Sequence, residues 1–93
     1  MIRTSKNAQT EALFLGQPAR RIDSRVRRRA KSKLNLINQA RELRDLRVPF
    51  SNNLEALRGD RAGQHSIRVN DQWRVCFIWE NGDAYDLEFC DYH

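Results

Sequence analysis

The sequence predicts an α+β fold in which helices pack against one face of an antiparallel sheet. In the first half of the 93-residue chain, apolar residues recur every three or four positions; after residue 64 they recur every second position. These periods are typical of helices and of strands, respectively. Only short turns separate the alternating segments, so successive strands must be antiparallel neighbours. The length allows a single domain that spans residues 1–93.

The N-terminal region predicts a strand followed by a short helix. Residues 2–6 are a candidate first strand, although their alternation is weak. Residues 8–15 suit a helix with Asn7 as its N-cap and Gly16 as its end. Pro18 then prevents the helix from continuing.

A longer amphipathic helix is expected over residues 23–40. One apolar stripe marks it, formed by Ile22, Val26, Ala30, Leu34 and Ile37. Leu43 and Leu46 extend the helical period to about residue 46, either directly or after a break, and Val48-Pro49 ends it.

Residues 51–63 read as loops that lead into the sheet. Residues 51–53 are expected to form a loop, Leu54 and Leu57 to fill the core, and residues 58–63 to form a turn-rich connection. Three strands then follow as a meander, over residues 65–69, 73–79 and 85–89, and Asn81-Gly82 is the strongest hairpin signal in the chain.

Positive charge gathers in the first half of the chain. The net charge is +5, but residues 1–50 carry 13 basic and 4 acidic side chains, while residues 51–93 carry 4 basic and 8 acidic ones. A basic cluster of this kind attracts phosphate backbones or an acidic protein partner. The alternative is a solvated helix face. Within the cluster we single out Arg27, Arg28 and Lys31 as candidate RNA-binding residues.

Several classes of protein are disfavoured by composition. No apolar run approaches the roughly 20 residues needed to cross a bilayer, and the polar N-terminus lacks the apolar segment of a signal peptide. Cys76 and Cys90 are too few for a disulfide framework, so we expect reduced thiols in the cytoplasm. Two histidines without Cys-x-x-Cys spacing predict no metal site, and we expect no cofactor.

Two segments resemble the HigB group of the RelE/ParE toxin superfamily. One is the run Leu54-Glu55-Ala56-Leu57-Arg58-Gly59-Asp60-Arg61-Ala62-Gly63-Gln64-His65-Ser66-Ile67-Arg68-Val69-Asn70-Asp71-Gln72-Trp73-Arg74-Val75, and the other is the terminal Asp91-Tyr92-His93. The opening residues 1–3 and the segment 41–46 are also similar to that group, so the likeness covers essentially the whole chain. It implies the RelE/ParE-like fold, with an N-terminal strand and two helices on an antiparallel sheet.

The resemblance also implies a function and its partners. It implies a bacterial type II toxin that acts as an mRNA endonuclease on translated messages in the ribosomal A site. A HigA-like helix-turn-helix antitoxin would neutralise it, and operator DNA would be bound only through the complex of the two proteins. Two alternatives stay open: a toxin of the same fold that poisons DNA gyrase without cleaving RNA, and a non-enzymatic nucleic-acid-binding module that uses the basic helix.

Metal-independent RNA cleavage requires phosphate contacts as well as proton transfer. Arg74 is expected to point away from its apolar strand neighbours and suits bidentate phosphate contact. The alternative for Arg74 is an ion pair with Asp86 or Glu88. Arg58 and Arg61 lie in the Gly-containing loop, where they are candidate phosphate ligands or simply solvated charges.

The last three residues and one loop residue complete the candidate site. Asp91, Tyr92 and His93 supply a carboxylate, a phenol and an imidazole, of which only the imidazole titrates near neutrality unaided. The alternative is a frayed tail. Glu55 stands where some HigB toxins carry a catalytic histidine, so it is either a base or a surface carboxylate. His65 reads as a core or edge histidine, and Trp79 as core.

Overall fold

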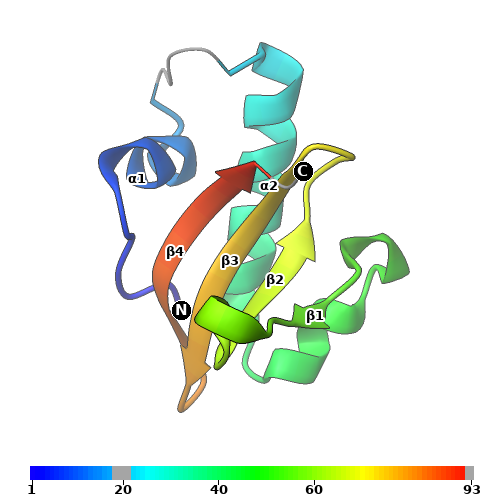
Figure 1. Cartoon of the computed structure of the whole chain (residues 1–93). Coiled ribbons are helices and arrows are strands. Elements are labelled where there is room, and N and C mark those ends of the chain that lie inside the picture. The colour runs from blue at the N-terminus through cyan, green and yellow to red at the C-terminus, as the bar shows by residue number, and fades with distance from the viewer. Residues whose placement is uncertain (18–21, 92–93) are drawn as a thin grey trace.

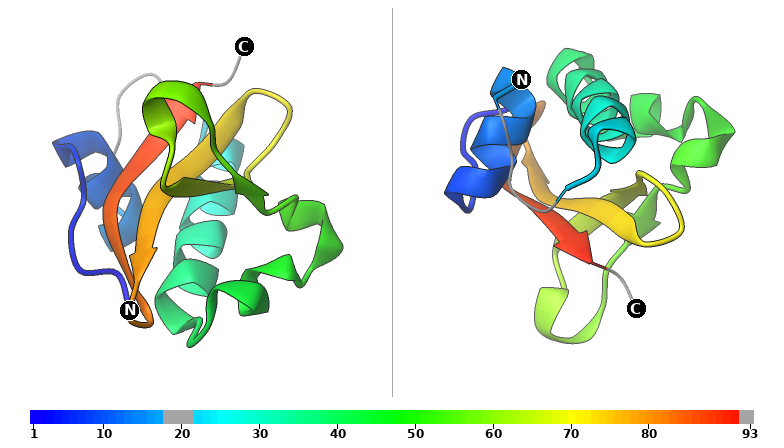
Figure 2. Two further views of the ribbon diagram at one scale, coloured as in Figure 1. Left: turned by 60° about the horizontal axis from the view of Figure 1, so that its bottom comes forward. Right: turned by 90° about the horizontal axis from the view of Figure 1, so that it is seen from above.

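The protein folds as two helices packed on one face of a four-stranded antiparallel sheet, as Figures 1 and 2 show. The computed structural model describes residues 1–17 and 22–91. The helices are α1 (Ala8–Leu15) and α2 (Ser24–Gln39). The strands lie in the order β1 (Glu55–Ala56), β2 (Gln64–Arg68), β3 (Trp73–Glu80) and β4 (Asp83–Asp91). The predicted α+β class is confirmed.

Both helices begin and end where the sequence places them. The Asn7 side chain accepts a hydrogen bond from the backbone N–H of Thr10, and Gly16 ends α1 in the left-handed conformation (φ 75°). Asp23 caps α2 by accepting from the backbone N–H of Arg25. The predicted apolar stripe of α2 is its buried face, where Ala30, Leu34 and Ile37 are fully buried. Amphipathic spacing therefore sets how α2 sits on the sheet.

The exposed faces of α2 carry an unusual excess of positive charge. Its 16 residues include six Lys or Arg and no acidic side chain. Cations near the N-terminus of a helix oppose the helix dipole at a cost of about 0.3–1 kcal/mol each. Arg25, Arg27 and Arg28 lie within the first two turns. The basic residues at these positions therefore do not stabilise the helix.

The segment after α2 is helical again after a break, but as a 3₁₀ helix and not as an α-helix. The chain leaves the helix at Ala40, which is extended, and the expected continuation over residues 43–46 is a separate 3₁₀ helix, η1 (Leu43–Arg47). The predicted loop at 51–53 is in part a second 3₁₀ helix, η2 (Phe50–Asn52). The fully buried Asn52 holds these turns together, because its side-chain amide donates to the carbonyl of Leu46 and its oxygen accepts from Lys33.

The N-terminal strand prediction is wrong in detail. Residues 2–6 form two isolated parallel bridges along the edge of β4, Ile2 with Ala84 and Ser5 with Leu87. The backbone N–H of Ile2 donates to the Asn38 side chain on α2 rather than to a strand. The fourth strand of the sheet is instead β1, which pairs Glu55 with Ser66 and Ala56 with His65.

Strand alternation gives the sheet two different faces. The face under the helices carries most of the core, including Ile67, Val75, Phe77 and Leu87. The register places Ser66, Cys76 and Glu88 in one row across the opposite face, next to the row of Arg68, Arg74 and Cys90. The loop between β1 and β2, which contains the 3₁₀ helix η3 (Gly59–Arg61), stands out from this second face in Figure 2. We call the face opposite the helices the outer face.

Candidate ribonuclease site on the outer face

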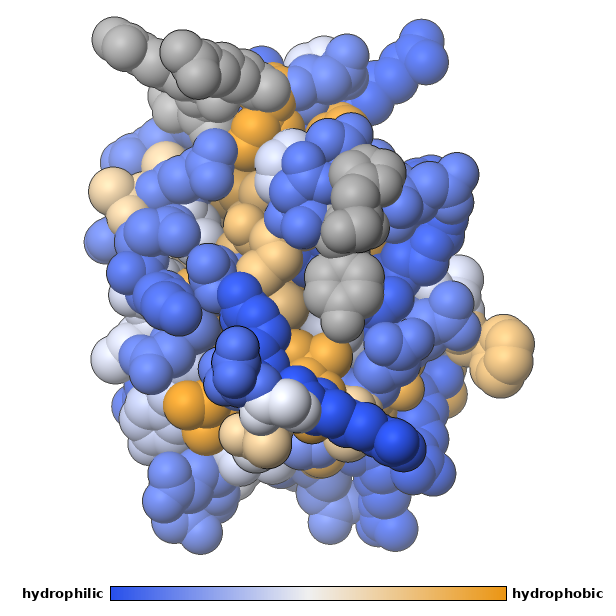
Figure 3. Space-filling view, viewed as in Figure 1, coloured by the Kyte–Doolittle hydropathy of each residue, from blue (hydrophilic) through white to orange (hydrophobic). Residues whose placement is uncertain are grey.

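The outer face gathers four of the predicted site residues. It is mostly hydrophilic, with a narrow apolar strip between the polar side chains, in the view of Figure 3. Glu55 enters it from β1, Arg74 from β3, and Arg58 and Arg61 from the loop before β2. Residues that are about 20 positions apart in the sequence therefore meet because β1, β2 and β3 are adjacent.

Arg74 is the best-positioned of these residues. Its side chain is only 8% exposed, and its Nε donates to the Ser66 hydroxyl at 2.8 Å. A terminal nitrogen donates to the carbonyls of Asn53 and Ser66, at 2.5 and 3.3 Å. The Glu55 carboxylate lies 3.9 Å away. Fixed backbone and hydroxyl acceptors thus hold the guanidinium in one orientation, as a phosphate ligand in a preorganised site requires.

The alternative of an ion pair between Arg74 and Asp86 or Glu88 is not what the structure shows. Glu88 pairs with Arg61 at 2.9 Å and with Lys6 at 3.6 Å, and Asp86 accepts from the Thr4 hydroxyl. Among the described residues, the carboxylate that pairs with Arg74 is that of Glu55, which is itself about half exposed. The sequence predicted the orientation of Arg74 correctly, and the ion pair that it offered as the alternative is absent.

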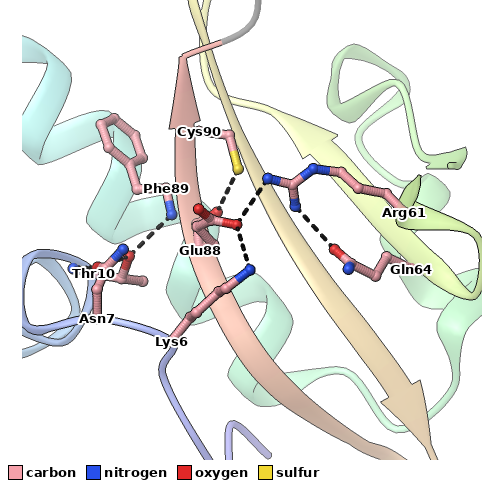
Figure 4. Close-up of polar contacts among 8 residues, drawn as sticks. All are labelled: Lys6, Asn7, Thr10, Arg61, Gln64, Glu88, Phe89 and Cys90. Carbon is pink, nitrogen blue, oxygen red and sulfur yellow. Dashed lines mark hydrogen bonds and ion pairs between the residues drawn. The ribbon is translucent and has the colours of Figure 1, made fainter. Parts of the chain in front are cut away.

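Arg61 crosses the outer face to β4 and is more than a solvated loop charge. Figure 4 shows its guanidinium between Gln64 Oε1, at 3.1 Å, and the Glu88 carboxylate. Burial alone would raise the pKa of Glu88, but the hydrogen bond and charge of Arg61 and the charge of Lys6 outweigh it and lower that pKa. The hydrogen bond that Arg61 donates to Glu88 raises the pKa of Arg61. The pair stays ionised and fixes the loop above the face.

Two free thiols lie beneath this ion pair. Cys76 and Cys90 are buried against Leu57 in a small cluster of their own. Interaction with the neighbouring Cys90 lowers the pKa of the Cys76 thiol, and the same interaction, together with burial, raises the pKa of Cys90. The Cys90 thiol also donates to the Glu88 carbonyl, as Figure 4 shows. The expectation that neither cysteine forms a disulfide agrees with the structure.

The chain end is only partly described. Asp91 ends β4 opposite Trp73, so strand alternation places it on the other face of the sheet from Arg74, and it accepts from the Gln72 side chain at 3.1 Å. Tyr92 and His93, which were predicted to be catalytic, lie outside the described residues. Arg58 is exposed at the start of η3.

The remaining predicted RNA-binding residues are on another surface. Arg27, Arg28 and Lys31 belong to α2, on the helical side of the sheet. His65 also belongs to that side, since it is half-buried, stacks near Phe77 with ring centroids 6.3 Å apart and pairs with Ala56 of β1. Because β2 lies between β1 and β3, His65 fits the core alternative and not the edge one, and its buried Nδ1 has no hydrogen-bond partner among the described residues. Trp79 packs against the core and meets Phe77 edge-on.

Sequence reasoning missed the residues that support Arg74. Ser66 and Asn53 contribute a hydroxyl and backbone carbonyls, and neither type is distinctive in a sequence. The one available signal was alternation: Ser66 shares a strand face with Gln64 and Arg68, the polar side of an otherwise apolar strand. In residues 1–17 and 22–91, no three His, Cys, Asp or Glu side chains form a group that could hold a metal ion.

Comparison with known proteins agrees with this architecture. The family model described as a RelE-like toxin of the type II toxin–antitoxin system HigB matches residues 8–93. The chain belongs to this family. Its relatives include the protein named Endoribonuclease HigB from Proteus vulgaris, 37% identical over the full length of both chains, and Toxin HigB-1 from Vibrio cholerae, 40% identical over 70% of this chain and 68% of that one.

Solved structures of RelE-like toxins share the fold of this HigB-family chain. An Escherichia coli YafQ mutant superposes with a TM-score of 0.67 at 15% identity, covering 98% of this chain and 91% of that one. The YoeB–YefM complex of Staphylococcus aureus gives 0.63 at 16% identity, covering 100% and 98%. Membership of a type II toxin family implies an antitoxin partner for this chain. Among its described residues, no helix is long and apolar enough to cross a membrane.

Proposed function

We propose that this HigB-family toxin is a metal-independent endoribonuclease that cleaves translated mRNA in the ribosomal A site. The observation that carries the proposal is the immobilised Arg74 guanidinium on the outer face, with the Glu55 carboxylate 3.9 Å away and Arg61 anchored nearby. The relative named as an endoribonuclease supports it as well.

The reaction needs few protein groups because the RNA supplies its own nucleophile. The 2′-oxygen attacks the adjacent phosphorus, a bond forms between them, and the bond to the leaving 5′-oxygen breaks. A base takes the proton of the 2′-hydroxyl, an acid protonates the 5′-oxygen, and cations neutralise charge on the phosphoryl oxygens. Arg74 supplies the fixed cation in this scheme, and Arg58 and Arg61 bind flanking phosphates on the loop.

Four residues are candidates for the base and the acid that transfer protons. The Glu55 carboxylate lies 3.9 Å from Arg74. The other candidates, Asp91, Tyr92 and His93, come from the chain end, where Asp91 lies on the opposite face of the sheet from Arg74. His93 has the only side chain among these whose ordinary pKa lies near neutrality, so it suits the acid. Tyr92 suits stacking on an RNA base. Arg27, Arg28 and Lys31 contact RNA outside the cleavage site.

The proposed partners follow from the family and the charge. The antitoxin is a HigA-like helix-turn-helix protein, and the complex of the two proteins binds operator DNA. The toxin itself works on the ribosome in the bacterial cytoplasm and uses no cofactor.

Mapping message ends in translating cells after induction tests the proposal. We expect new 5′ ends within coding sequences for the wild type and for Arg44→Ala, an exposed η1 control. We expect Arg74→Lys, which keeps the charge but loses the planar fork, to cut at least about 100-fold more slowly. Glu55→Gln, at an exposed position that tolerates exchange, should slow cleavage about 10²–10⁴-fold if Glu55 is the base.

Two outcomes would contradict the proposed nuclease activity. Growth arrest with intact messages would do so, and so would toxicity that survives removal of residues 91–93. The second result would favour the alternative of a gyrase poison, which inhibition of DNA supercoiling in vitro would then identify.

A further inference from the structure

The two cysteines of the chain lie together on the outer face, and RNA cleavage uses neither of them. Cys76, on β3, pairs with Glu88 of β4. Cys90, two residues further along β4, pairs with Arg74 of β3. Strand alternation therefore places both thiols on the same face as diagonal neighbours. With Leu57 they form a buried cluster that is separate from the main core.

Cys76 stands between the two acceptors that hold the arginines of the outer face. Its partners across the neighbouring strands are Ser66 on β2 and Glu88 on β4. Ser66 accepts from Arg74 Nε at 2.8 Å, and Glu88 accepts from Arg61 at 2.9 Å. A shift of the backbone at Cys76 therefore reaches both guanidinium groups.

The two thiols differ in their ability to react. Interaction with Cys90 lowers the pKa of Cys76 most, and the positive charges of Arg61 and Arg74 lower it further against the effect of burial. The thiol of Cys90 keeps its proton and donates it to the Glu88 carbonyl at 3.5 Å. Cysteines beside cationic groups react with oxidants because the thiolate is the nucleophile. A thiolate with a second thiol in contact is the arrangement found in redox-sensing pairs.

The loop that covers the thiols is able to open while the sheet stays folded. Cys76 is fully buried, so an oxidant reaches it only when its cover moves. The loop over residues 58–63 is held to β4 by the ion pair of Arg61 with Glu88, beside which the Cys90 sulfur lies in Figure 4. Both members of the pair are partly exposed, and no residue of η3 in this loop is buried. Segments with so few buried contacts open locally at low cost.

We propose that Cys76 and Cys90 are a modification site at which hydrogen peroxide forms a reversible disulfide. The Cys76 thiolate attacks one peroxide oxygen, the O–O bond breaks, and a sulfenic acid forms as hydroxide leaves. The Cys90 sulfur then attacks the sulfenic sulfur, the S–O bond breaks, and the departing hydroxyl leaves as water with the Cys90 proton. In total the two thiols lose two electrons and two protons, and the peroxide is reduced to two water molecules. Thiol–disulfide exchange with a small thiol restores both cysteines.

The disulfide also changes the outer face. Diagonal neighbours on antiparallel strands have Cα atoms about 7–8 Å apart, whereas a disulfide requires about 4.4–6.8 Å. The strands β3 and β4 must therefore shift where Cys76 and Cys90 lie, and the acceptors of Arg74 and Arg61 shift with them. The oxidised chain should cleave RNA more slowly. This consequence rests on the proposed function, whereas the disulfide itself does not.

Peptide mapping of the purified, reduced chain after treatment with hydrogen peroxide tests the site. We expect an intramolecular disulfide between Cys76 and Cys90 in the wild type, and dithiothreitol should remove it. Cys90→Ala should stop at a sulfenic acid on Cys76, which dimedone traps, and Cys76→Ala should leave Cys90 as a thiol. Peroxide treatment that left both wild-type thiols free, or oxidised them to sulfinic acids without a disulfide, would overturn the site. Dimedone on Cys90 but not on Cys76 would overturn the order of the steps.

A variant in the core separates local opening from oxidation of unfolded chains. Ile37 is fully buried on α2, on the other side of the sheet, so Ile37→Val weakens the fold without touching the thiols. If only unfolded chains reacted, this variant would form the disulfide about 2- to 13-fold faster than the wild type. We expect equal rates, because only the loop opens. The faster rate would overturn the site as a feature of the folded protein.

Cleavage of a translated message by the oxidised chain tests the effect on the outer face. The assay uses purified ribosomes without a thiol reductant, and the control is the same oxidised sample after reduction. We expect cleavage to be about 10–100-fold slower with the disulfide in place and to recover on reduction. Equal cleavage by the two forms would overturn the link to Arg74 and Arg61. Loss of cleavage by the reduced chain would count against the proposed function, whereas peptide mapping decides the disulfide in either case.

Discussion

At the scale of single residues, Glu88 is the acidic centre of the outer face. Its carboxylate receives Arg61 from the loop and Lys6 from the N-terminal segment, so one side chain ties two distant parts of the chain to β4. Both cations are partly exposed, and each contact is worth about 0.2–1 kcal/mol. The importance of Glu88 lies less in this energy than in where it holds Arg61.

The first prediction concerns the pH dependence that Glu88 imparts. Because Arg61 and Lys6 lower the pKa of Glu88 in the folded state, its ionised form stabilises the fold above the unfolded pKa, near 4.5, and this contribution is lost as the pH falls through the folded pKa. Glu88→Gln should therefore be less stable than the wild type at pH 7, by about 0.4–2 kcal/mol for the two contacts together, and the difference should shrink below about pH 4.5. Urea unfolding at pH 7 and pH 3 measures it.

The control for this prediction is Glu80→Gln, which removes an exposed carboxylate from the end of β3. It should show no comparable change with pH. If Glu88→Gln lost as much stability at pH 3 as at pH 7, ionisation of Glu88 would not be the cause.

Residues show unequal degrees of predictability from the sequence. The face of the sheet that Arg74 occupies is predictable, because a single arginine that alternates with apolar residues is easy to recognise in the sequence. Its acceptors were not foreseen, since a backbone carbonyl and a serine hydroxyl become special only when β1, β2 and the η2 turn come together. The pairing of Arg61 with Glu88 spans 27 positions and was missed for the same reason.

At the scale of elements, the sequence predicts the ends of helices well where a nearby capping residue alone determines them. Asn7, Gly16 and Asp23 set the limits of α1 and α2 through hydrogen bonds to neighbours in sequence. Sequence patterns did not predict β1 or the conformation of residues 2–6, because both depend on which edge of the sheet is available for pairing. The two-residue β1 exists because β2 offers an edge to it, and no periodicity can reveal so short a strand.

The second prediction concerns the contact between α1 and β4. The Thr10 hydroxyl donates to the Asn7 side chain at 2.8 Å and accepts from the backbone N–H of Phe89 at 3.0 Å, while the residue is fully buried. Figure 4 shows how this hydroxyl occupies the edge of β4. Thr10→Val keeps the shape but leaves the Phe89 N–H unpaired, which should destabilise the fold by about 1–3 kcal/mol. Denaturant unfolding measures the loss.

Thr10→Ser is the matched variant. It keeps the hydroxyl and should retain most of the stability that Thr10→Val loses. Hydrogen exchange at the Phe89 amide gives an independent readout: we expect faster exchange in Thr10→Val than in Thr10→Ser. If Thr10→Val were more stable than Thr10→Ser, packing of the methyl group, and not the hydroxyl, would stabilise the contact.

At the scale of the whole molecule, charge and chemistry are divided between the two sides of the sheet. The cationic helix α2 lies on one side, and the Arg74 and Arg61 networks lie on the other. The uneven distribution of charge in the sequence predicted two surfaces, but only the packing of α2 on the sheet shows that they face in different directions. An RNA that reached both would have to pass around an edge of the sheet.

The last prediction follows from the size of the domain and its membership of a toxin–antitoxin family. A chain of 93 residues buries only about 60–65% of the surface exposed on unfolding, so its own stability is modest. An antitoxin that binds only the folded toxin adds about 2.7 kcal/mol at a free concentration 100 times its Kd. For a domain of this size, that should raise the Tm by about 10–20 °C. Thermal scans of the toxin at increasing antitoxin concentration measure the shift, which should continue to grow logarithmically beyond saturation. A Tm that stays constant while the complex forms would mean that the antitoxin binds the unfolded chain as tightly as the folded one.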